Sequence, residues 1–237
     1  MRFRPYPGFT IFAAILFAIL CGLGVWQLQR LQWKLALIAQ VNGHMTAPPV
    51  SLDQALKMDA DTVQYRRVAL AGRFDYANEA YIFTTGPDGA PVYHVLTPLR
   101  TDDGRTLLVD RGAVPKRKLD PATRAAGNPP GKTRLVGVWR VPDPPGWFTP
   151  PPDRAHRVWY SRDMAGIAAA DHLKLSAPAV IEADATPNPG GWPKGGQTVV
   201  TFRNEHLSYA ITWFGLALML FGVWISYHAS RGRLAWR

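Results

Sequence analysis

Residues 9–28, FTIFAAILFAILCGLGVWQL, decide the fold, because they form a twenty-residue stretch without a charged side chain. A second uncharged stretch, LSYAITWFGLALMLFGVWISY, occupies residues 207–227. At about 1.5 Å per residue, each makes a helix about 30 Å long, which matches the hydrocarbon core of a bilayer. The sequence therefore predicts a membrane protein with two transmembrane helices that flank the residues between them.

A cleavable signal peptide is the main alternative for residues 9–28, since Arg2 and Arg4 give the chain a basic start. The stretch runs on into GVWQLQRLQWK without a small-x-small cleavage pattern, which favours an uncleaved anchor. No Arg- and Ser-rich transit segment precedes it. We therefore expect a bacterial protein.

Arginines near the two spans orient the chain. They lie in both terminal segments, at Arg2, Arg4, Arg231, Arg233 and Arg237. Because basic residues favour the cytoplasmic side, residues 1–8 and 228–237 are predicted to be cytoplasmic tails. Residues 29–206 then form a periplasmic domain, and the protein belongs in the bacterial inner (plasma) membrane. Arg30 and Lys34, just after the first span, count against this orientation.

The central domain shows the pattern of an antiparallel sheet. Runs rich in β-branched and aromatic residues predict strands at 63–74, 80–85, 92–99, 105–112, 133–141, 156–160 and 178–183. The turn sequences at 86–89 (GPDG) and 101–104 (TDDG) predict hairpins. The expected fold is an α+β domain with a mainly antiparallel sheet or a small barrel.

Helices are expected at three further places. The first span should continue as a helix until Pro48 and Pro49 stop it. Ser51, with Gln54 three positions later, predicts a capping box for a short helix at 52–58. Ser161 is the expected cap of an amphipathic helix at 162–173.

Enzyme motifs are absent from the sequence. It has no G-x-S-x-G, no H-E-x-x-H, no phosphate-binding glycine loop and no C-x-x-C, and its single cysteine, Cys21, lies in the first span. The net charge of +10 is scattered rather than clustered, so it does not indicate nucleic-acid binding. We interpret the protein as a non-enzyme.

His206 differs from the other five histidines because it lies at the outer end of the second span. His228 is 22 residues further on, about 33 Å along a helix, so the two cannot bind one metal ion. Tyr209 and Trp213 share the helix face of His206 and would suit the faces of a porphyrin. Haem ligation is one hypothesis for this pattern, and ordinary interfacial composition is the other.

Small residues recur every four positions in the first span, at Ala14, Ala18 and Gly22, and Trp26 continues the series. Such a stripe allows close approach of another helix. The second span is the expected partner. Trp26 and His206 would then face each other near the same membrane surface.

Five blocks, in order, carry a resemblance to a known family. They are GVWQLQRLQWK, YRRVALAGRF, YHVLTPLRTDDGRTLLVDRGAVP, WYSRDMAGIAA and NEHLSYAITWFGLA. With its two-anchor topology, the chain resembles the surfeit-locus protein one family of cytochrome c oxidase assembly factors. The resemblance implies a role in maturing haem-copper oxidases, with haem a bound and placed in the catalytic subunit. The implied partners are that subunit, other oxidase assembly or haem-synthesis proteins, and the lipid bilayer.

The resemblance also implies roles for individual residues. His206 matches the family's second-span histidine and is the implied ligand of the haem iron, with Tyr209, Trp213 and Trp26 around the cofactor. Arg111 and Gly112 match a V-N-R-G-W block, in which Arg111 serves either domain structure, the preferred reading, or a haem propionate.

Three positions depart from the family's pattern: Asp110 stands where the family usually has Asn, Ala113 where it has Trp, and Glu205 where it has Asn. Glu205 would either accept the imidazole N–H of His206 or be solvated.

Two other functions remain open. One is a membrane-anchored protein–protein scaffold for the oxidase subunit that does not bind haem. The other is a membrane-tethered periplasmic hydrolase, which a buried Ser–His or Asp–His contact in the central domain would favour.

Overall fold

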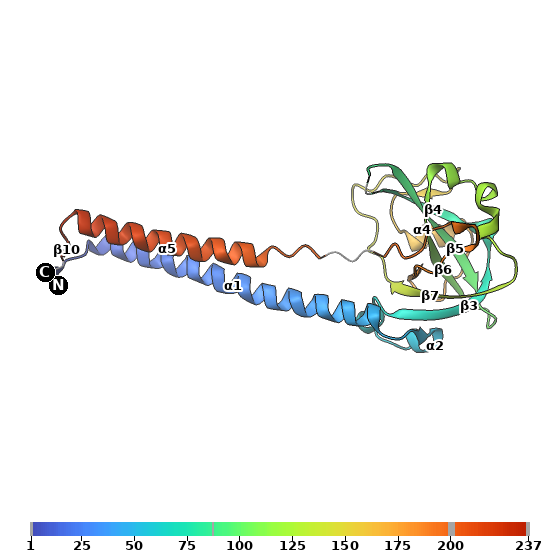
Figure 1. The fold of residues 1–237 in the computed structure, drawn as a ribbon, viewed down its shortest axis with the longest axis horizontal. Helices are drawn as coiled ribbons and strands as arrows, with labels where there is room; N and C mark the ends of the chain where they lie inside the picture. The colour runs from blue at the N-terminus through green and yellow to red at the C-terminus, as the bar shows by residue number, and fades with distance from the viewer. Residues whose placement is uncertain (1, 87, 199–201, 236–237) are drawn as a thin grey trace. The chain divides into compact units, whose positions relative to one another are not determined.

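The structure is a computed structural model that describes residues 2–86, 88–198 and 202–235. It divides into two compact units. We call Met1–Gln40 with Thr201–Arg237 the helical unit, and Val41–Val200 the sheet unit. The colours of Figure 1 show that the helical unit joins the two ends of the chain.

The helical unit consists of α1 (Pro7–Thr46), whose last turns enter the sheet unit, and α5 (His206–Ser230). β1 (Arg2–Phe3) pairs antiparallel with β10 (Leu234–Ala235). Both helices are long and apolar enough to cross a membrane, with mean hydropathies of 2.4 and 1.7, and they fit a membrane protein. α1 ends before Pro48, which confirms that the first helix continues past its apolar stretch.

α1 and α5 lie side by side and antiparallel (Figure 1). Three hydrogen bonds fix their register: His206 with Gln27, Trp224 Nε1 to Thr10 Oγ1 at 3.2 Å, and the Tyr6 backbone N–H to His228 Nε2 at 3.3 Å. In each pair the residue numbers sum to nearly the same value, as straight antiparallel helices require.

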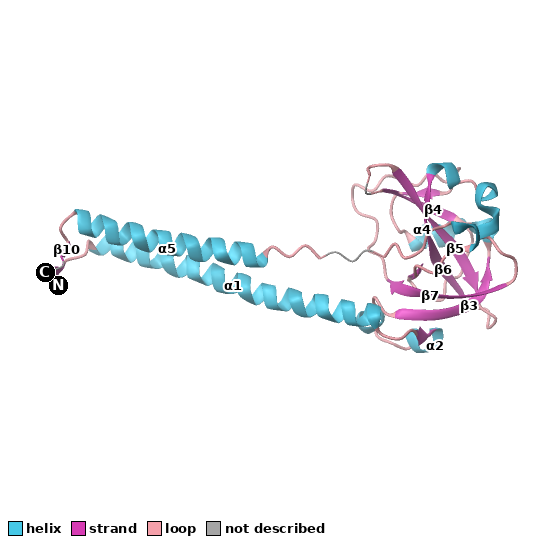
Figure 2. Ribbon diagram, viewed as in Figure 1, coloured by secondary structure: helices cyan, strands magenta, loops and turns pink. Residues whose placement is uncertain are grey.

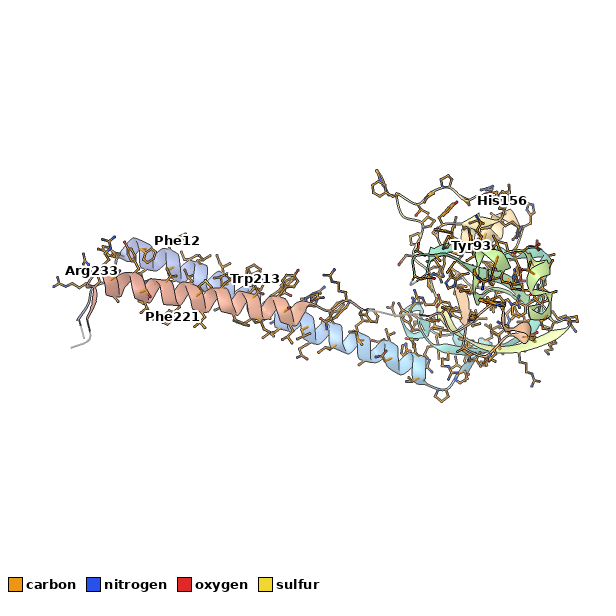
Figure 3. The ribbon with its side chains drawn as sticks, turned by 45° about the horizontal axis from the view of Figure 1, so that its top comes forward. Phe12, Tyr93, His156, Trp213, Phe221 and Arg233 are labelled. Carbon is orange, nitrogen blue, oxygen red and sulfur yellow. The ribbon has the colours of Figure 1, made fainter. Side chains whose placement is uncertain are left out.

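The second span is the partner of the first, as expected, but the prediction that the small-residue stripe forms the contact was wrong. Ala14, Ala18, Gly22 and Trp26 are all exposed. The buried face of α1 instead carries Ala13, Leu20, Gly24 and Gln27, and that of α5 carries Ala210 and Ala217. Neighbouring residues on a helix point about 100° apart, so a shift of one or two positions turns the stripe away. Figure 3 shows the apolar side chains that both helices leave exposed, Phe12 and Phe221 among them.

The sheet unit contains a closed barrel of five strands (Figure 2). β3 (Arg67–Phe74) pairs with β7 (Lys132–Arg140), and β7 pairs with β9 (Val180–Ala183). β9 pairs with β6 (Thr106–Pro115), and β6 pairs with β5 (Pro91–Arg100). β5 returns to β3 through two residue pairs, which closes the ring.

Three strands extend the barrel. β4 (Ala80–Thr85) pairs antiparallel with β5, β8 (Val158–Trp159) adds in parallel to β4, and β2 (Val50–Ser51) adds in parallel to β3. The two predicted hairpins join β4 to β5 and β5 to β6. These observations confirm a mainly antiparallel sheet closed into a small barrel.

Short helices connect the strands. They are α2 (Leu52–Ala55), α3 (Ala60–Val63), α4 (Met164–Ala170) and the 3-10 turns η1 (Tyr76–Asn78), η2 (Lys116–Lys118), η3 (Pro121–Gly127) and η4 (Pro189–Gly191). The capping box of Ser51 and Gln54 is confirmed. The strand predicted from residue 63 starts only at Arg67, because α3 ends at Val63 and a turn follows it.

The cap predicted at Ser161 was wrong. The carboxylate of Asp163 accepts the Gly166 N–H at 2.9 Å, so the helix begins at Met164. A carboxylate immediately before the first helical residue caps more directly than a serine three positions earlier.

Candidate functional site

His206 is the first residue of α5, and its ring is held by α1. Its Nδ1 lies 2.7 Å from Oε1 of Gln27. Gln27 is only 9% exposed, whereas His206 is half-buried. The imidazole is thus anchored on one nitrogen by a buried amide and partly open on the rest of its ring.

The aromatic residues predicted to surround His206 lie at different depths. Trp213 is half-buried, whereas Tyr209 is 54% exposed and Trp26 is 50% exposed. Trp26 precedes Gln27 in the chain, so its side chain points about 100° away from the face that contacts His206. The structure therefore does not bring Trp26 and His206 face to face. Figure 3 shows Trp213 on α5.

Glu205 does not take the imidazole N–H. This residue is the N-cap of α5, and its Oε1 lies 3.6 Å from Nε of Arg203. Its side chain is half exposed, so the charge is largely solvated. Gln27, rather than Glu205, is the hydrogen-bond partner of Nδ1 of His206.

These residues fit an axial ligand of haem. A neutral imidazole coordinates a metal through a ring nitrogen that carries a lone pair. Among the described residues, none is hydrogen-bonded to Nε2 of His206, and the flanking aromatic side chains are partly exposed. The same part of the chain contains no group of three or more His, Cys, Asp or Glu side chains arranged for a metal ion.

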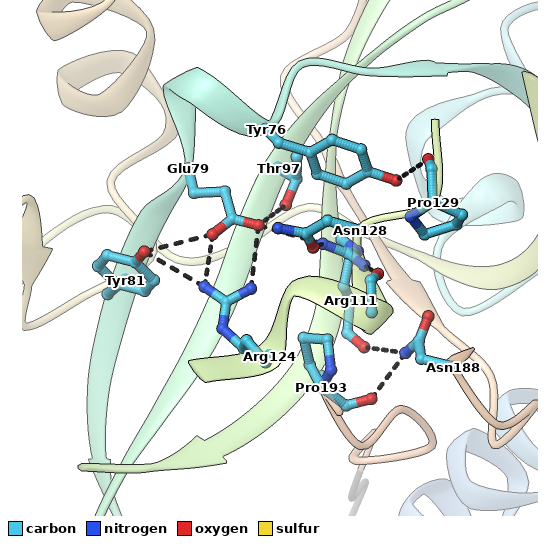
Figure 4. A network of polar contacts seen from close by, with 12 residues as sticks. Tyr76, Glu79, Tyr81, Thr97, Arg111, Arg124, Asn128, Pro129, Asn188 and Pro193 are labelled. Atoms are coloured by element: carbon cyan, nitrogen blue, oxygen red, sulfur yellow. Dashed lines mark hydrogen bonds and ion pairs between the residues drawn. The ribbon is translucent and has the colours of Figure 1, made fainter. Parts of the chain in front are cut away.

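Arg111 lies in the sheet unit, on β6, and takes part in a buried ion network (Figure 4). Its Nη1 donates to Oε1 of Glu79 at 3.1 Å and to Oδ1 of Asn128 at 2.8 Å. Arg124 Nη2 donates to the other Glu79 oxygen at 2.5 Å. Glu79, Arg111 and Arg124 are each less than 5% exposed.

Two guanidinium groups share one carboxylate in this network, which we call the Glu79 network. The guanidinium group of Arg111 also lies over two aromatic rings. Its carbon is 5.0 Å from the ring centres of both Phe74 and Tyr76. Burial lowers the pKa of Arg111, and the charge of Glu79 opposes that shift. Burial, followed by the charge of Glu79, raises the pKa of Tyr81 to about 12. These contacts support a structural role for Arg111 rather than a role in binding a haem propionate.

Gly112 lies inside β6, within the strand predicted at 105–112. Its φ is +113°, and a Cβ at this position would lie 2.0 Å from the backbone oxygen of Lys194. Ala113 exchanges backbone hydrogen bonds with Lys194, which draws the two segments together. Arg111 and Gly112 therefore both have structural roles in the barrel. The side chain of Arg111 is buried, and Gly112 has no side chain where the backbones of β6 and Lys194 meet.

Asp110 and His94 form a contact that the sequence did not reveal. His94 Nδ1 lies 2.8 Å from Asp110 Oδ2, and Asp110 also accepts from the Gly112 N–H and from Arg162. Burial alone would raise the pKa of Asp110, but the hydrogen bond from His94 and the charges of His94 and Arg162 hold it below its usual value. His94 borders a cavity of about 580 Å³. The sequence feature that could have pointed to this contact is Asp110, which stands where the family usually has Asn.

The model of the SURF1 family matches residues 14–218. Surfeit locus protein 1 of Mus musculus is 39% identical over 226 residues, which cover 86% of this chain and 70% of that protein. The Homo sapiens protein of that name is 37% identical, with coverages of 86% and 72%, and the Takifugu rubripes protein is 35% identical, with coverages of 86% and 90%. The chain belongs to the SURF1 family.

Proposed function

We propose that this protein is an assembly factor for a haem-copper (cytochrome c) oxidase that binds haem a through His206 and assists its insertion into the catalytic subunit. The SURF1 family is known for cytochrome oxidase assembly factors, which supports the general role. One observation supports the haem assignment: a half-buried imidazole at the start of an apolar helix is held on Nδ1, while no described residue is bonded to Nε2.

The proposed division of labour follows the two units. His206 offers Nε2, and Trp213 and Tyr209 provide apolar surface on α5. Bound haem a would supply an iron centre that accepts the imidazole nitrogen. The barrel provides a surface for the oxidase subunit. We place the protein in the bacterial inner membrane, with both termini cytoplasmic and the sheet unit periplasmic.

The test is haem occupancy. The full-length chain is purified in detergent from cells that make haem a, as wild type, His206→Ala and His156→Ala. His156 is the matched control because its side chain is 76% exposed and belongs to the sheet unit. We expect His206→Ala to lose its haem, whereas His156→Ala keeps the wild-type amount.

Equal occupancy in all three proteins would remove the ligand assignment. Gel filtration shows whether each variant is folded, so that a loss of haem is not confused with a loss of protein. The scaffold alternative is tested in cells that lack haem a. It predicts that the oxidase subunit still co-purifies with the wild-type chain in these cells. It also predicts that the purified chain carries no pigment, whether or not the cells make haem a.

The pair of His94 and Asp110 favours a second candidate, a hydrolase. A buried carboxylate that holds Nδ1 of a histidine leaves Nε2 to act as a base. Among the described residues, no hydroxyl or thiol is hydrogen-bonded to His94, so the base would have to act on water. Oxidase assembly should then fail in His94→Gln while haem occupancy is unchanged. Normal assembly in His94→Gln would exclude this candidate.

A further inference from the structure

Gln27 is a polar side chain in an otherwise apolar part of α1. Only Thr10 and Gln27 interrupt the apolar character of residues 9–28. A buried amide without hydrogen-bond partners costs roughly 1–3 kcal/mol in a protein, and more in surroundings that contain no water. Gln27 is 9% exposed, and its side-chain carbonyl oxygen is hydrogen-bonded to Nδ1 of His206. Polar residues buried between membrane-spanning helices are candidate functional residues.

The chemistry of this bond defines the state of the imidazole. With the Gln27 amide oriented so that its oxygen faces His206, as in this structure, the oxygen accepts and Nδ1 carries the proton. In a neutral imidazole, the lone pair then lies on Nε2. Residues that accept the second N–H of a metal-binding histidine fix its tautomer, orient its ring and increase its basicity.

We propose that Gln27 is a positioning residue that holds His206 in the Nδ1–H tautomer and thereby presents the Nε2 lone pair to the haem iron. This inference rests on the proposed function for its haem, but the tautomer itself is a property of the haem-free chain. Glu205 is engaged with Arg203, so the neutral amide makes this contact in its place.

A purely structural bond between α1 and α5 is the competing explanation. It predicts that loss of the bond lowers stability and leaves the imidazole otherwise unchanged. The positioning role predicts a change in tautomer and in ligand strength as well. Gln27→Leu removes the acceptor at similar size, and Gln27→Glu restores an acceptor. Gln29→Leu is the matched control, because Gln29 lies two residues further on α1 and is exposed.

The first measurement uses the haem-free, full-length chain in detergent micelles. Nitrogen-15 chemical shifts of the His206 ring, recorded at a pH where imidazole is neutral, report which nitrogen carries the proton. We expect the Nδ1–H form in the wild type, in Gln27→Glu and in Gln29→Leu. Gln27→Leu should shift toward the Nε2–H form that predominates in free histidine. The Nε2–H form in the wild type would overturn the proposal.

The second measurement uses the haem-loaded proteins. Loss of a residue that orients a metal ligand typically lowers metal affinity by roughly 10- to 100-fold, and we expect that loss of haem affinity in Gln27→Leu. The midpoint potential of the iron should rise in Gln27→Leu and fall in Gln27→Glu, because a stronger acceptor makes the imidazole a stronger donor. Identical potentials in all variants would leave only a structural bond and contradict the proposal.

The outcomes separate this inference from the proposed function. If His206→Ala keeps its haem, the ligand assignment fails, but the tautomer measured without haem is unaffected. If His206→Ala loses its haem while the wild type shows the Nε2–H form, the ligand assignment survives and the role of Gln27 fails.

Discussion

Glu79 in the sheet unit and His206 in the helical unit differ in how fully their polar atoms are used. In the sheet unit, Glu79 accepts from both buried arginines and from the hydroxyls of Tyr81 and Thr97, so its oxygens are fully used. In the helical unit, Gln27 holds Nδ1 of His206, and no other described residue is hydrogen-bonded to the ring. A network in which every polar atom is hydrogen-bonded stabilises a fold. An imidazole that is hydrogen-bonded on one nitrogen can still bind a ligand through the other. The comparison supports a structural role for Arg111 and agrees with the proposal that His206 binds a ligand.

The largest expected effect comes from breaking the Glu79 network. Glu79→Gln leaves two guanidinium groups in the core without a counter-charge. Removing one partner of a buried ion pair costs about 3–5 kcal/mol, and we expect a loss of stability in that range. Urea unfolding of the full-length protein, followed by fluorescence of buried Trp139 and Trp159, measures it.

The control for that variant is Asp102→Asn. Asp102 pairs with Lys132 and Arg73 on the exposed surface. Solvent screens such pairs, so the free energy of unfolding should hardly change. Equal losses in both variants would show that the Glu79 network has no special place in the fold.

A second large effect is expected at Gly112. Gly112→Ala places a Cβ against the backbone of Lys194 and forces alanine into a positive φ. Strain at such a φ alone costs roughly 1–3 kcal/mol. Gly104→Ala is the control, because Gly104 has a φ of +83° with no atom within 4 Å of the added Cβ. Thermal unfolding should show a clearly lower midpoint for Gly112→Ala than for Gly104→Ala. Equal midpoints would exclude a steric requirement between β6 and Lys194.

The pH dependence of stability tests Asp110. Its pKa is lowered in the folded protein, so its ionised form contributes stability that is fully present above the unfolded value of about 3.9. That contribution is lost as the pH falls through the lower, folded value. Asp110→Asn should therefore flatten the decline in stability below about pH 4. Urea unfolding at several pH values between 2 and 6 measures the slope, and an unchanged slope would contradict the prediction.

The smallest effect concerns the contact between α1 and α5. A Cβ at Gly24 would lie 2.7 Å from the Phe214 ring, whereas a Cβ at Gly22 would meet nothing within 4 Å. Alanine is favoured over glycine in a helix by about 1 kcal/mol, so Gly22→Ala should raise the thermal midpoint of the helical unit. Gly24→Ala should gain less, because the ring must move. A larger gain at Gly24 would show that the two helices pack in another way.

Much of the fold could be predicted from the sequence. The two apolar stretches, the capping box at Ser51 and the hairpin turns are local signals, and each was confirmed. The closure of β3 on β5 could not be derived, because two residue pairs between distant segments leave no local pattern. The helix face of α1 was also missed. Small residues at Ala14 and Ala18 suggested one face, whereas Gly24 and Gln27 form the contact.

The site was predicted only in part. His206 was singled out because it lies at the outer end of the second span, and its role as a ligand stays a prediction. Gln27 was visible in the sequence as the polar interruption of the first span, but its partner is 179 residues away. The placement of Trp26 depended on the wrong helix face. The partners of Arg111 lie on Glu79 and Asn128, and no spacing in the sequence links them.

The most direct measurement of the central claim is the absorption spectrum of His206→Gly purified from cells that make haem a, with and without added imidazole. The account predicts that the variant lacks the wild-type haem spectrum and that free imidazole restores it, because the small molecule replaces the missing axial nitrogen. A His206→Gly protein that carries haem with the wild-type spectrum in the absence of imidazole would contradict the account.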